Sequence, residues 1–383
     1  MDDNFTEITS ESWFSRILNS LKGIVFGIVL IALSVFLLYW NESRAVTTAK
    51  SLKEGMGAVV SVEATAVNPA NDKKLVHVSG EAKTSETIND PAFAISAQAI
   101  RLTRNVEMFQ WKEVEKSETQ KKLGGGTETV KTYNYEKTWA PDVIDSSKFK
   151  VAQDHQNPAK MLATHNVSTA SNVTLGAFQL GASLIAKMSG DQPRQVTEQD
   201  FAKLPASLKT NAKLEGSGFY FGGDPAAPAI GDQRVTFKVL TPAVFSILAR
   251  QAGQTFEPYP TKAGREIERV EAGQVSADLM FAHAAKENAM LAWGLRLVGF
   301  LLMAFGIGLI LSPISVFADV IPFLGDILGV GVAFTALLLA MAFSIVTIAV
   351  AWIAVRPILG GALLAGAIAW IVFGKRLAAR RTA

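Results

Sequence analysis

The chain has apolar spans towards both ends and a long polar region between them. Residues 21–40 are nearly free of charge, and residues 291–311 are apolar except for Arg296 near their start. Two further apolar spans, residues 327–355 and 358–373, follow before the C-terminus. Because the hydrocarbon core of a bilayer is about 30 Å thick and needs roughly 20 helical residues to cross it, this pattern predicts four transmembrane helices. The third span must tilt or protrude, and the fourth is short.

The boundaries of these spans carry further signals. Arg16 and Lys22 precede the first apolar run, as in a cleaved signal peptide. The run ends in an interfacial Tyr-Trp pair at residues 39–40, and no small-x-small cleavage site directly follows, so we predict that the span is retained. An Arg-Pro pair at residues 356–357 separates the last two spans, and a charged residue followed by a helix breaker is typical of a hairpin turn at the membrane interface.

The charges at the C-terminus predict the orientation. Residues 374–383 form a basic tail after the last span, and the positive-inside rule keeps such a tail in the cytoplasm. With four spans, both termini are cytoplasmic, and residues 1–20 form a cytoplasmic N-terminal segment. Residues 41–290 then form an extracytoplasmic domain, in the bacterial periplasm or in the lumen of a eukaryotic organelle. The basic residues of the tail are Lys375, Arg376, Arg380 and Arg381.

The polar region has the pattern of an α+β domain. Residues 75–80 alternate as in a half-buried strand. Residues 99–115 and 127–139 read as two long strands, joined by a glycine-rich connection at residues 121–126. Residues 173–188 have apolar side chains near helical spacing and predict a helix, packed on the sheet or on the membrane. Residues 216–271 return to short β-like runs.

Aromatic side chains gather on single faces of the two long strands. Phe109 and Trp111 share a face of the first strand, and Tyr133, Tyr135 and Trp139 share a face of the second. Cross-strand aromatic pairing accounts for this pattern, and we expect it here. The functional alternative is an aromatic platform for a ligand or a lipid headgroup.

Composition limits the partners of the chain. The whole chain holds 37 basic and 34 acidic residues, and residues 41–290 are close to neutral, so nothing indicates a nucleic-acid partner. Cysteine is absent, so the domain is held by a hydrophobic core without disulfides.

No local motif predicts catalysis or metal binding. The four histidines, His77, His155, His165 and His283, are too far apart for a local metal motif, and we expect them to be solvated or hydrogen-bonded. Nucleophile elbows, Walker loops and dinucleotide fingerprints are absent from the sequence. We therefore predict no catalytic, cofactor-binding or metal-binding residues and no cofactor.

Two aspartates between the second and third spans are the candidates for chemistry at membrane depth. Asp319 and Asp326 do not follow the pattern of two aspartates on separate spans that aspartyl intramembrane proteases use. On one helix they form a polar stripe opposite an apolar face, which predicts an interfacial amphipathic segment over residues 312–326. We expect one of them to pair with Lys375 or Arg376, the alternative being a solvated loop.

Small residues recur at every fourth position in two spans. Ala304 and Gly308 form one such pair, and residues 361, 365 and 369 form a second series of glycine and alanine. Small residues let helix backbones approach closely, so we expect packing within the chain. Self-association would use the same surface.

The long strands and several further segments resemble the transmembrane protein 43 family, also called LUMA. The resemblance implies a four-span protein with a luminal or extracytoplasmic domain and carries no catalytic residues with it. Animal members are proteins of the endoplasmic reticulum and the inner nuclear membrane that self-associate and bind lamina components. The absence of cysteine suits a bacterial relative, which has no lamina. The matching segments are residues 104–113, 133–135, 139, 157–159, 231–237, 261–264 and 293–296, followed by Asp319, Pro322, Asp326, Trp352 and residues 356–357.

These observations favour a non-enzymatic membrane scaffold that forms homo-oligomers and organises membrane protein partners in the lipid bilayer. Its location would be the inner membrane of a bacterium, or the endoplasmic reticulum or inner nuclear membrane of a eukaryote. An ion channel or transporter is the first alternative, although the spans hold few ionisable groups to line a polar path. A membrane-bound hydrolase is the second.

Overall fold

The computed structural model describes residues 4–355 and positions 358, 361, 362 and 365. It confirms an α+β chain with three long helices, α1 (Trp13–Ala58), α5 (Ala277–Ala318) and α6 (Pro322–Val355). Within the described residues, these three are the helices long and apolar enough to cross a membrane. They contain the first three predicted spans. The predicted fourth span, apart from its few described positions, and the basic tail lie outside the described residues.

Two larger sheets make up the domain between α1 and α5. The first has the order β1-β7-β6-β14-β13-β12, with β8 beside β6 and β11 beside β14. Its strands are β1 (Asn4–Glu11), β6 (Arg101–Lys121), β7 (Thr127–Ala140), β8 (Asn166–Thr169), β11 (Gln192–Arg194), β12 (Ala212–Glu215), β13 (Gly218–Phe221) and β14 (Gln233–Leu240).

The second sheet has the order β10-β9-β3-β15-β16, with β2 parallel to β3 and β19 antiparallel to β15. Its strands are β2 (Val60–Glu63), β3 (Leu75–Lys83), β9 (Thr174–Leu175), β10 (Phe178–Gln179), β15 (Ala243–Ala252), β16 (Thr255–Glu257) and β19 (Arg269–Ala272).

Short elements complete the described part of the domain. The hairpins are β4 (Thr87–Asp90) with β5 (Ile95–Gln98), and β17 (Tyr259–Pro260) with β18 (Glu266–Ile267). The short helices are α2 (Ala182–Lys187), α3 (Glu198–Lys203) and α4 (Ala206–Lys209), and the 3₁₀ turns are η1 (Pro69–Asn71) and η2 (Ser146–Lys148).

The hydrophobic core of the domain joins both sheets. Side chains of β3 and β15 and side chains of β6, β13 and β14 belong to one buried cluster. Phe93 lies within it and contacts Phe219, Phe221 and Phe237, with ring centroids 5.9–6.3 Å apart. Beside this cluster, Arg104 on β6 forms a buried ion pair with Asp90 at 2.7 Å. On β6 the core includes Leu102 and Val106, near the start of the strand, and so lies away from the hairpin connection after Lys121.

The predicted β6–β7 hairpin is confirmed, and it is longer than predicted. β6 continues to Lys121, and its register with β7 places Phe109 opposite Trp139, with ring centroids 5.2 Å apart. The predicted cross-strand aromatic pairing is therefore present. Gly124 and Gly125 in the connection have positive φ angles of 88° and 82°, which glycine adopts at low cost.

The predicted helix over residues 173–188 is wrong for most of its length. Only α2, residues 182–187, is helical, and β9 and β10 precede it as a two-stranded hairpin. Gly176 turns between them with φ 60°, and a Cβ there would lie 2.0 Å from the carbonyl oxygen of Ala64. Phe178 stacks on Phe256 at 4.9 Å. Tertiary packing on the second sheet thus decides the conformation of this apolar segment.

The predicted amphipathic segment 312–326 is also not one helix. α5 continues through Pro313 to Ala318, and α6 starts at Pro322. Asp319 caps α5, with its N–H donated to the carbonyls of Ser315 and Val316. The segment is therefore the turn between two long helices.

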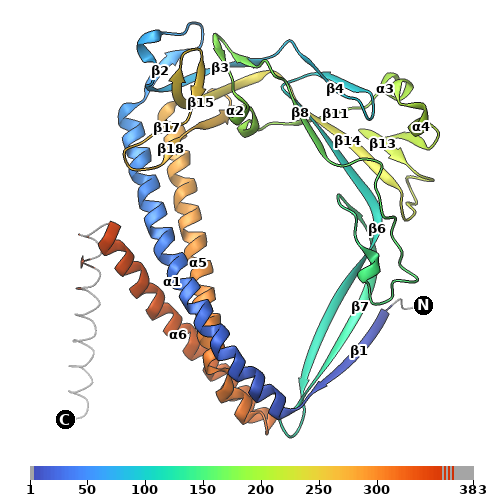
Figure 1. Ribbon diagram of the computed structural model, residues 1–383, viewed down its shortest axis with the longest axis vertical. Coiled ribbons are helices and arrows are strands. Elements are labelled where there is room, and N and C mark those ends of the chain that lie inside the picture. Colours follow the sequence, from blue (N-terminus) through green and yellow to red (C-terminus); the bar gives the residue numbers. More distant parts are fainter. Residues whose placement is uncertain (1–3, 356–357, 359–360, 363–364, 366–383) are drawn as a thin grey trace.

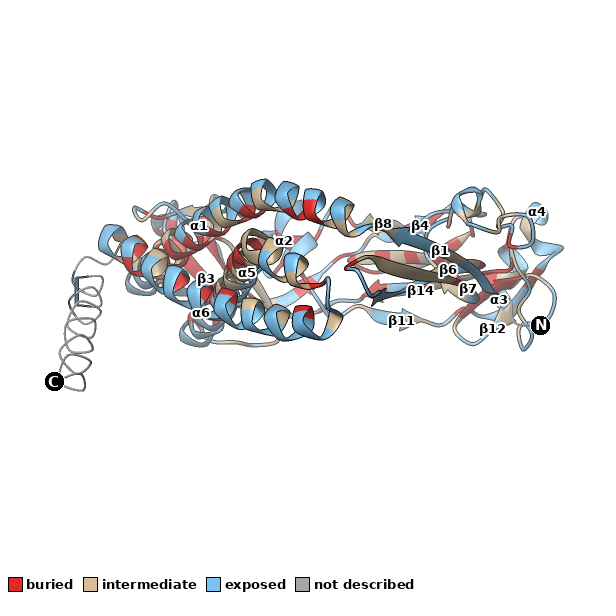
Figure 2. Cartoon of the chain, turned by 90° about the horizontal axis from the view of Figure 1, so that it is seen from below, coloured by how far each residue is buried: buried red, intermediate tan, exposed pale blue. Residues whose placement is uncertain are grey.

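The long helices and the long strands form the two sides of a ring. Figure 1 shows α1 and α5 side by side along one side, and β1, β6 and β7 along the other, with the two sides meeting at the α5–α6 turn. α1 has 46 residues, which gives about 69 Å at 1.5 Å per residue. Figure 2 shows that much of the helix surface is exposed, and the exposed side chains of residues 21–40 include Val25, Phe26 and Phe36.

Close packing of α1 on α5 uses glycines that the small-residue pattern did not single out. A Cβ on Gly27 would lie 2.5 Å from the carbonyl oxygen of Gly306, and a Cβ on Gly306 would lie 2.8 Å from that of Gly27. Ser34 adds a hydrogen bond to the carbonyl of Gly299 at 2.6 Å. At Gly308 and Gly361, by contrast, a Cβ would meet no atom of the described chain within 4 Å.

An ion pair beside α2 gives the domain an expected acid sensitivity. Arg101 donates to Asp191 at 2.9 and 2.5 Å, and this hydrogen bonding holds the pKa of Asp191 below its ordinary value of 3.8 despite the opposing effect of burial. Since the folded state binds this proton less readily than the unfolded state, the stabilisation is present above about pH 4 and is lost as pH falls through the lowered pKa.

We therefore expect Asp191→Asn to lower stability at pH 7 and to flatten the dependence of the unfolding midpoint on pH between about 5 and 3. Chemical denaturation followed by tryptophan fluorescence at several pH values measures both effects. The matched control is Asp142→Asn, because Asp142 is exposed and has no ion pair within the described part of the chain. An unchanged pH slope in Asp191→Asn would contradict the assignment.

Candidate functional site: the charged junction at the helix ends

Three segments that are distant in sequence meet at Asp319 in the α5–α6 turn. The side chain of Asp319 is 2 % exposed and accepts from Arg16 of α1 at 2.5 Å and from Lys121 of β6 at 2.6 Å. Lys121 also reaches Asp326 of α6 at 2.8 Å, and the carboxylate of Asp326 is 67 % exposed. We call these four residues the charged junction.

Hydrogen bonds to backbone carbonyls and close packing also hold the junction together. The indole N–H of Trp13 donates to the carbonyl of Val316 at 3.0 Å, and the N–H of Gly124 donates to the carbonyl of Val320 at 3.2 Å. Gly125 lies against Trp13, where a Cβ would be 2.3 Å from the indole ring. Arg16 also donates to the carbonyl of Gly125. The tip of the hairpin therefore needs glycine in order to approach the helices.

The electrostatics of the junction favour full ionisation of Lys121. Its partial burial would lower its pKa, but hydrogen bonds from its ammonium group to Asp319 and Asp326 outweigh this effect and raise the pKa. The cationic side chains of Arg16 and Lys121 therefore both contact the buried carboxylate of Asp319. A buried carboxylate that accepts from a charged donor on each oxygen fixes the segments that supply those donors relative to one another.

The predicted pairing of Asp319 or Asp326 with Lys375 or Arg376 stays a prediction, and the described residues show other partners. Arg16 and Lys121 occupy Asp319, whereas Lys375 and Arg376 lie outside the described residues. The solvated-loop alternative is wrong for Asp319, which is buried, although Asp326 is largely exposed. The sequence does not reveal the partner Lys121 because about 200 residues separate it from both aspartates.

We expect Asp319→Asn to release the hairpin tip. Loss of hydrogen bonds to a charged group costs about 1.5–3 kcal/mol, which is roughly tenfold or more in a local opening equilibrium. Hydrogen exchange of residues 122–126 should accelerate accordingly, with little change in the core of the domain. The control is Asp326→Asn, which removes one exposed ion pair worth about 0–1 kcal/mol. Equal exchange rates in the two variants would show that Asp319 does not hold the tip.

A second polar cluster lies between the helices. Glu42 of α1 is 1 % exposed and accepts from Arg296 of α5 at 2.6 and 2.9 Å and from the indole of Trp352 of α6 at 2.6 Å. Asn41 donates to the carbonyl of Ala292 at 2.9 Å. All three long helices therefore share one buried carboxylate. Arg296 stands out in the sequence as a charged residue in the second apolar span, but the sequence does not indicate that Glu42 is its partner.

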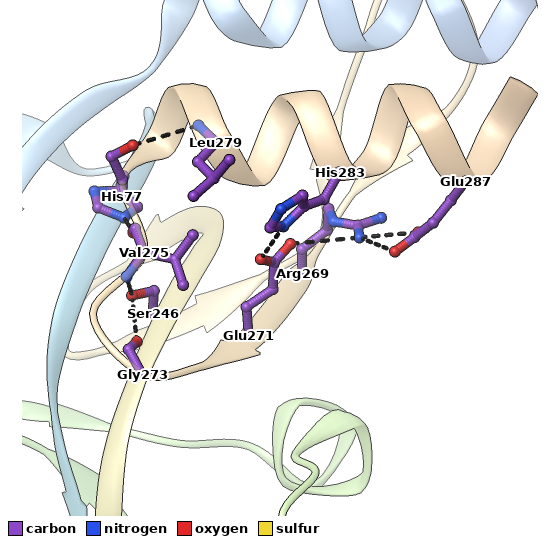
Figure 3. A network of polar contacts seen from close by, with 10 residues as sticks. His77, Ser246, Arg269, Glu271, Gly273, Val275, Leu279, His283 and Glu287 are labelled. Carbon is purple, nitrogen blue, oxygen red and sulfur yellow. Dashed lines mark hydrogen bonds and ion pairs between the residues drawn. The ribbon is translucent and has the colours of Figure 1, made fainter.

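A third network attaches the start of α5 to the second sheet (Figure 3). Ser246 of β15 accepts from the N–H of Val275 and donates to the carbonyl of Gly273, both at 2.8 Å. His77 of β3 lies 2.8 Å from the carbonyl of Val275. One turn further along α5, His283 contacts Glu271, while Arg269 contacts Glu287 at 2.9 Å. The helix therefore leaves the sheet through a fixed connection.

The remaining histidines, His155 and His165, lie in the connection between β7 and β8. His155 stacks on Tyr135 with ring centroids 3.7 Å apart and contacts Trp111 edge-on at 4.7 Å. His165 lies 3.1 Å from Asn105. The described residues include no group of three or more acidic, histidine or cysteine side chains that could hold a metal ion. The structure does not bring the four histidines together.

The fold and these clusters define the class of the protein. It is a membrane protein in which the apolar helices α1 and α5 contact an α+β domain at both of their ends. A family model for transmembrane protein 43 matches residues 108–357. The chain is 31 % identical to rat transmembrane protein 43 over 92 % of its own length and 90 % of that protein, and 31 % identical to the human protein over 92 % and 89 %. A transmembrane protein 43 homolog of Drosophila melanogaster is 28 % identical over 92 % and 94 %.

The chain belongs to the transmembrane protein 43 family. This confirms the resemblance found in the sequence. No solved structure matches the chain.

Proposed function

We propose that this protein is a non-enzymatic membrane scaffold that presents its α+β domain on an apolar helical anchor and self-associates. The observation that carries the proposal is that the buried carboxylates of the long helices connect different segments of the chain. Asp319 and Glu42, the buried carboxylates of the long helices, each accept hydrogen bonds on both oxygens from side chains of other segments. Such ion pairs between segments hold the elements in place.

An apolar groove on α5 and α6 is the surface that we propose for self-association. It has a volume of about 390 Å³ and is lined by Leu301, Ala304, Phe305, Gly308, Leu309, Ala333, Ala336 and Leu337. Ala304 and Gly308 are the small residues that the sequence pattern singled out. Because small residues let a further helix approach closely, a second copy fits this groove without a polar contact.

The compartment stays a prediction. The relatives come from animals, whereas the absence of cysteine suits a bacterial inner membrane; in a eukaryote the location would be the endoplasmic reticulum or the inner nuclear membrane. We propose that the domain of residues 41–290 is extracytoplasmic and binds membrane protein partners there.

Purification from the native membrane in mild detergent tests the proposal. We expect a homo-oligomer by size-exclusion chromatography with light scattering, together with reproducible protein partners by mass spectrometry. Gly308→Leu should fill the groove and shift the protein towards monomer, while Gly294→Leu, also on an open face of α5, should not. A monomer without partners, combined with ion flux in proteoliposomes, would instead favour the channel alternative.

A further inference from the structure

A cavity of about 280 Å³ lies between α1, α5 and the short strands β18 and β19. Arg44 and Thr48, one turn apart on α1, line it together with Asn288 and Leu291 of α5 and Glu266 of β18. None of these residues belongs to the apolar groove that we propose for self-association. The cavity is therefore a separate site, and it holds whether or not the protein is a scaffold.

The cavity lies at the depth of lipid headgroups. Arg44 is four residues beyond Trp40, where the first apolar run ends, and this distance is about 6 Å at 1.5 Å per residue. Leu291 is the first residue of the second apolar span and is 51 % exposed. The headgroup layer directly adjoins the hydrocarbon core of a bilayer and is about 5–7 Å thick on each side. A membrane that covers the apolar spans therefore places its headgroups beside this cavity.

Arg44 lines the cavity without an anionic partner. Its terminal nitrogens donate to the amide oxygens of Asn288 at 3.0 Å and Asn41 at 3.3 Å. In the described part of the chain, its Nε is buried without a hydrogen-bond partner, and Glu42 on the same helix pairs instead with Arg296. Each terminal nitrogen of a guanidinium carries two N–H groups, so Arg44 can still donate to a ligand. Guanidinium groups bind phosphate oxygens especially well.

A carboxylate without an ion pair also lines the cavity. Glu266 is exposed and forms no ion pair with a described residue. The other charged lining residues of the two strands and of α5 are paired, because Glu268 contacts Lys187 and Arg269 contacts Glu287 at 2.9 Å (Figure 3). A purely anionic ligand would be repelled by Glu266, whereas a zwitterionic ligand satisfies both unpaired groups.

We propose that this cavity binds the headgroup of phosphatidylethanolamine from the surrounding membrane. The phosphate accepts hydrogen bonds from Arg44, and the primary ammonium group donates to Glu266. The volume is at the lower end of ligand sites, which span about 300–1,000 Å³, so the cavity has room for a headgroup but not for the acyl chains. These chains would follow the exposed apolar surface of α5 that starts at Leu291.

Native mass spectrometry of the full-length protein in detergent, titrated with dioctanoyl phosphatidylethanolamine, tests the phosphate contact. We expect Arg44→Gln to weaken binding about tenfold, because charge-assisted hydrogen bonds to the phosphate are lost. Thr48→Phe should give a similar loss by filling the cavity, and it keeps the test valid if Arg44→Gln fails to fold. The control is Lys50→Gln, an exposed basic residue of α1 outside the cavity. Wild-type affinity in folded Arg44→Gln or Thr48→Phe protein would overturn the proposal.

A second titration tests the class of ligand. The wild-type protein should bind dioctanoyl phosphatidylethanolamine more tightly than dioctanoyl phosphatidylglycerol, which has a phosphate but no ammonium group. Glu266→Gln should remove this preference and leave binding of phosphatidylglycerol unchanged or tighter. Inorganic phosphate that binds as tightly as the lipid would show a free-anion site and overturn the lipid assignment. A preference for phosphatidylglycerol in the wild-type protein would overturn the role of Glu266.

Discussion

Glu42→Ala is expected to lower the free energy of unfolding of the helix bundle by about 3–5 kcal/mol. The substitution leaves the guanidinium of Arg296, whose side chain is 19 % exposed, without its carboxylate and removes the acceptor of the Trp352 indole. An uncompensated buried charge accounts for most of this cost. Thermal or SDS-induced unfolding of the protein in mixed micelles, followed by tryptophan fluorescence, measures the change.

Two controls separate the ion pair from general effects of losing a glutamate. Glu118→Ala changes an exposed residue of β6 and should leave the unfolding midpoint nearly unchanged. The double variant Glu42→Leu with Arg296→Met replaces the pair by apolar side chains of similar size, and such replacements are often neutral. We expect the double variant to recover most of the stability. A double variant as unstable as Glu42→Ala would mean that packing around Glu42, and not its charge, determines the effect.

Gly27→Val is expected to force α1 and α5 apart. The new Cβ would lie 2.5 Å from the carbonyl oxygen of Gly306 and 3.0 Å from the side chain of Ile310, and the first of these is backbone that cannot rotate away. Overpacking of this kind costs about 1–3 kcal/mol, and occasionally more. The unfolding midpoint in detergent should fall, and a spin-label pair across the two helices should report a larger distance.

Gly294→Val is the matched control for Gly27→Val. Both glycines lie in long apolar helices, but a Cβ on Gly294 meets no atom of the described chain within 4 Å. Valine also has a similar intrinsic helix propensity at both positions, so this contribution cancels in the comparison. If both variants were equally stable, the close approach of the two helices would not be important for the bundle.

Local sequence signals predicted the strands better than the short helices. The β6–β7 hairpin could be predicted because alternation, aromatic pairing and a glycine-rich connection all indicate the same element. The helix predicted over residues 173–188 was wrong for most of its length, because a run of apolar residues fits both a buried helix and buried strands. The turn at Gly176 against Ala64 selects the strands, and this contact joins residues more than 100 positions apart.

The sequence indicated the two aspartates of the candidate site but not the residues that pair with them. Asp319 and Asp326 stand out because charge between two apolar spans is costly and therefore informative. Their partners do not stand out, since Arg16 and Lys121 are ordinary basic residues in polar surroundings. A detectable signal for the α1–α5 packing was present in Gly23 and Gly27, a small-xxx-small pair in the first span, although the structure uses only Gly27 for the closest approach.

The sequence by itself determined that this is a membrane protein, that its polar region is an α+β domain, and to which family it belongs. Each of these rests on hydropathy, alternation or matching segments, which are properties of neighbouring residues. Only the tertiary structure decided that the hairpin tip closes onto the helix ends and that three helices share Glu42. Those contacts depend on the length and direction of whole elements. The strands and helices must end at the same place before their charged side chains can form buried ion pairs.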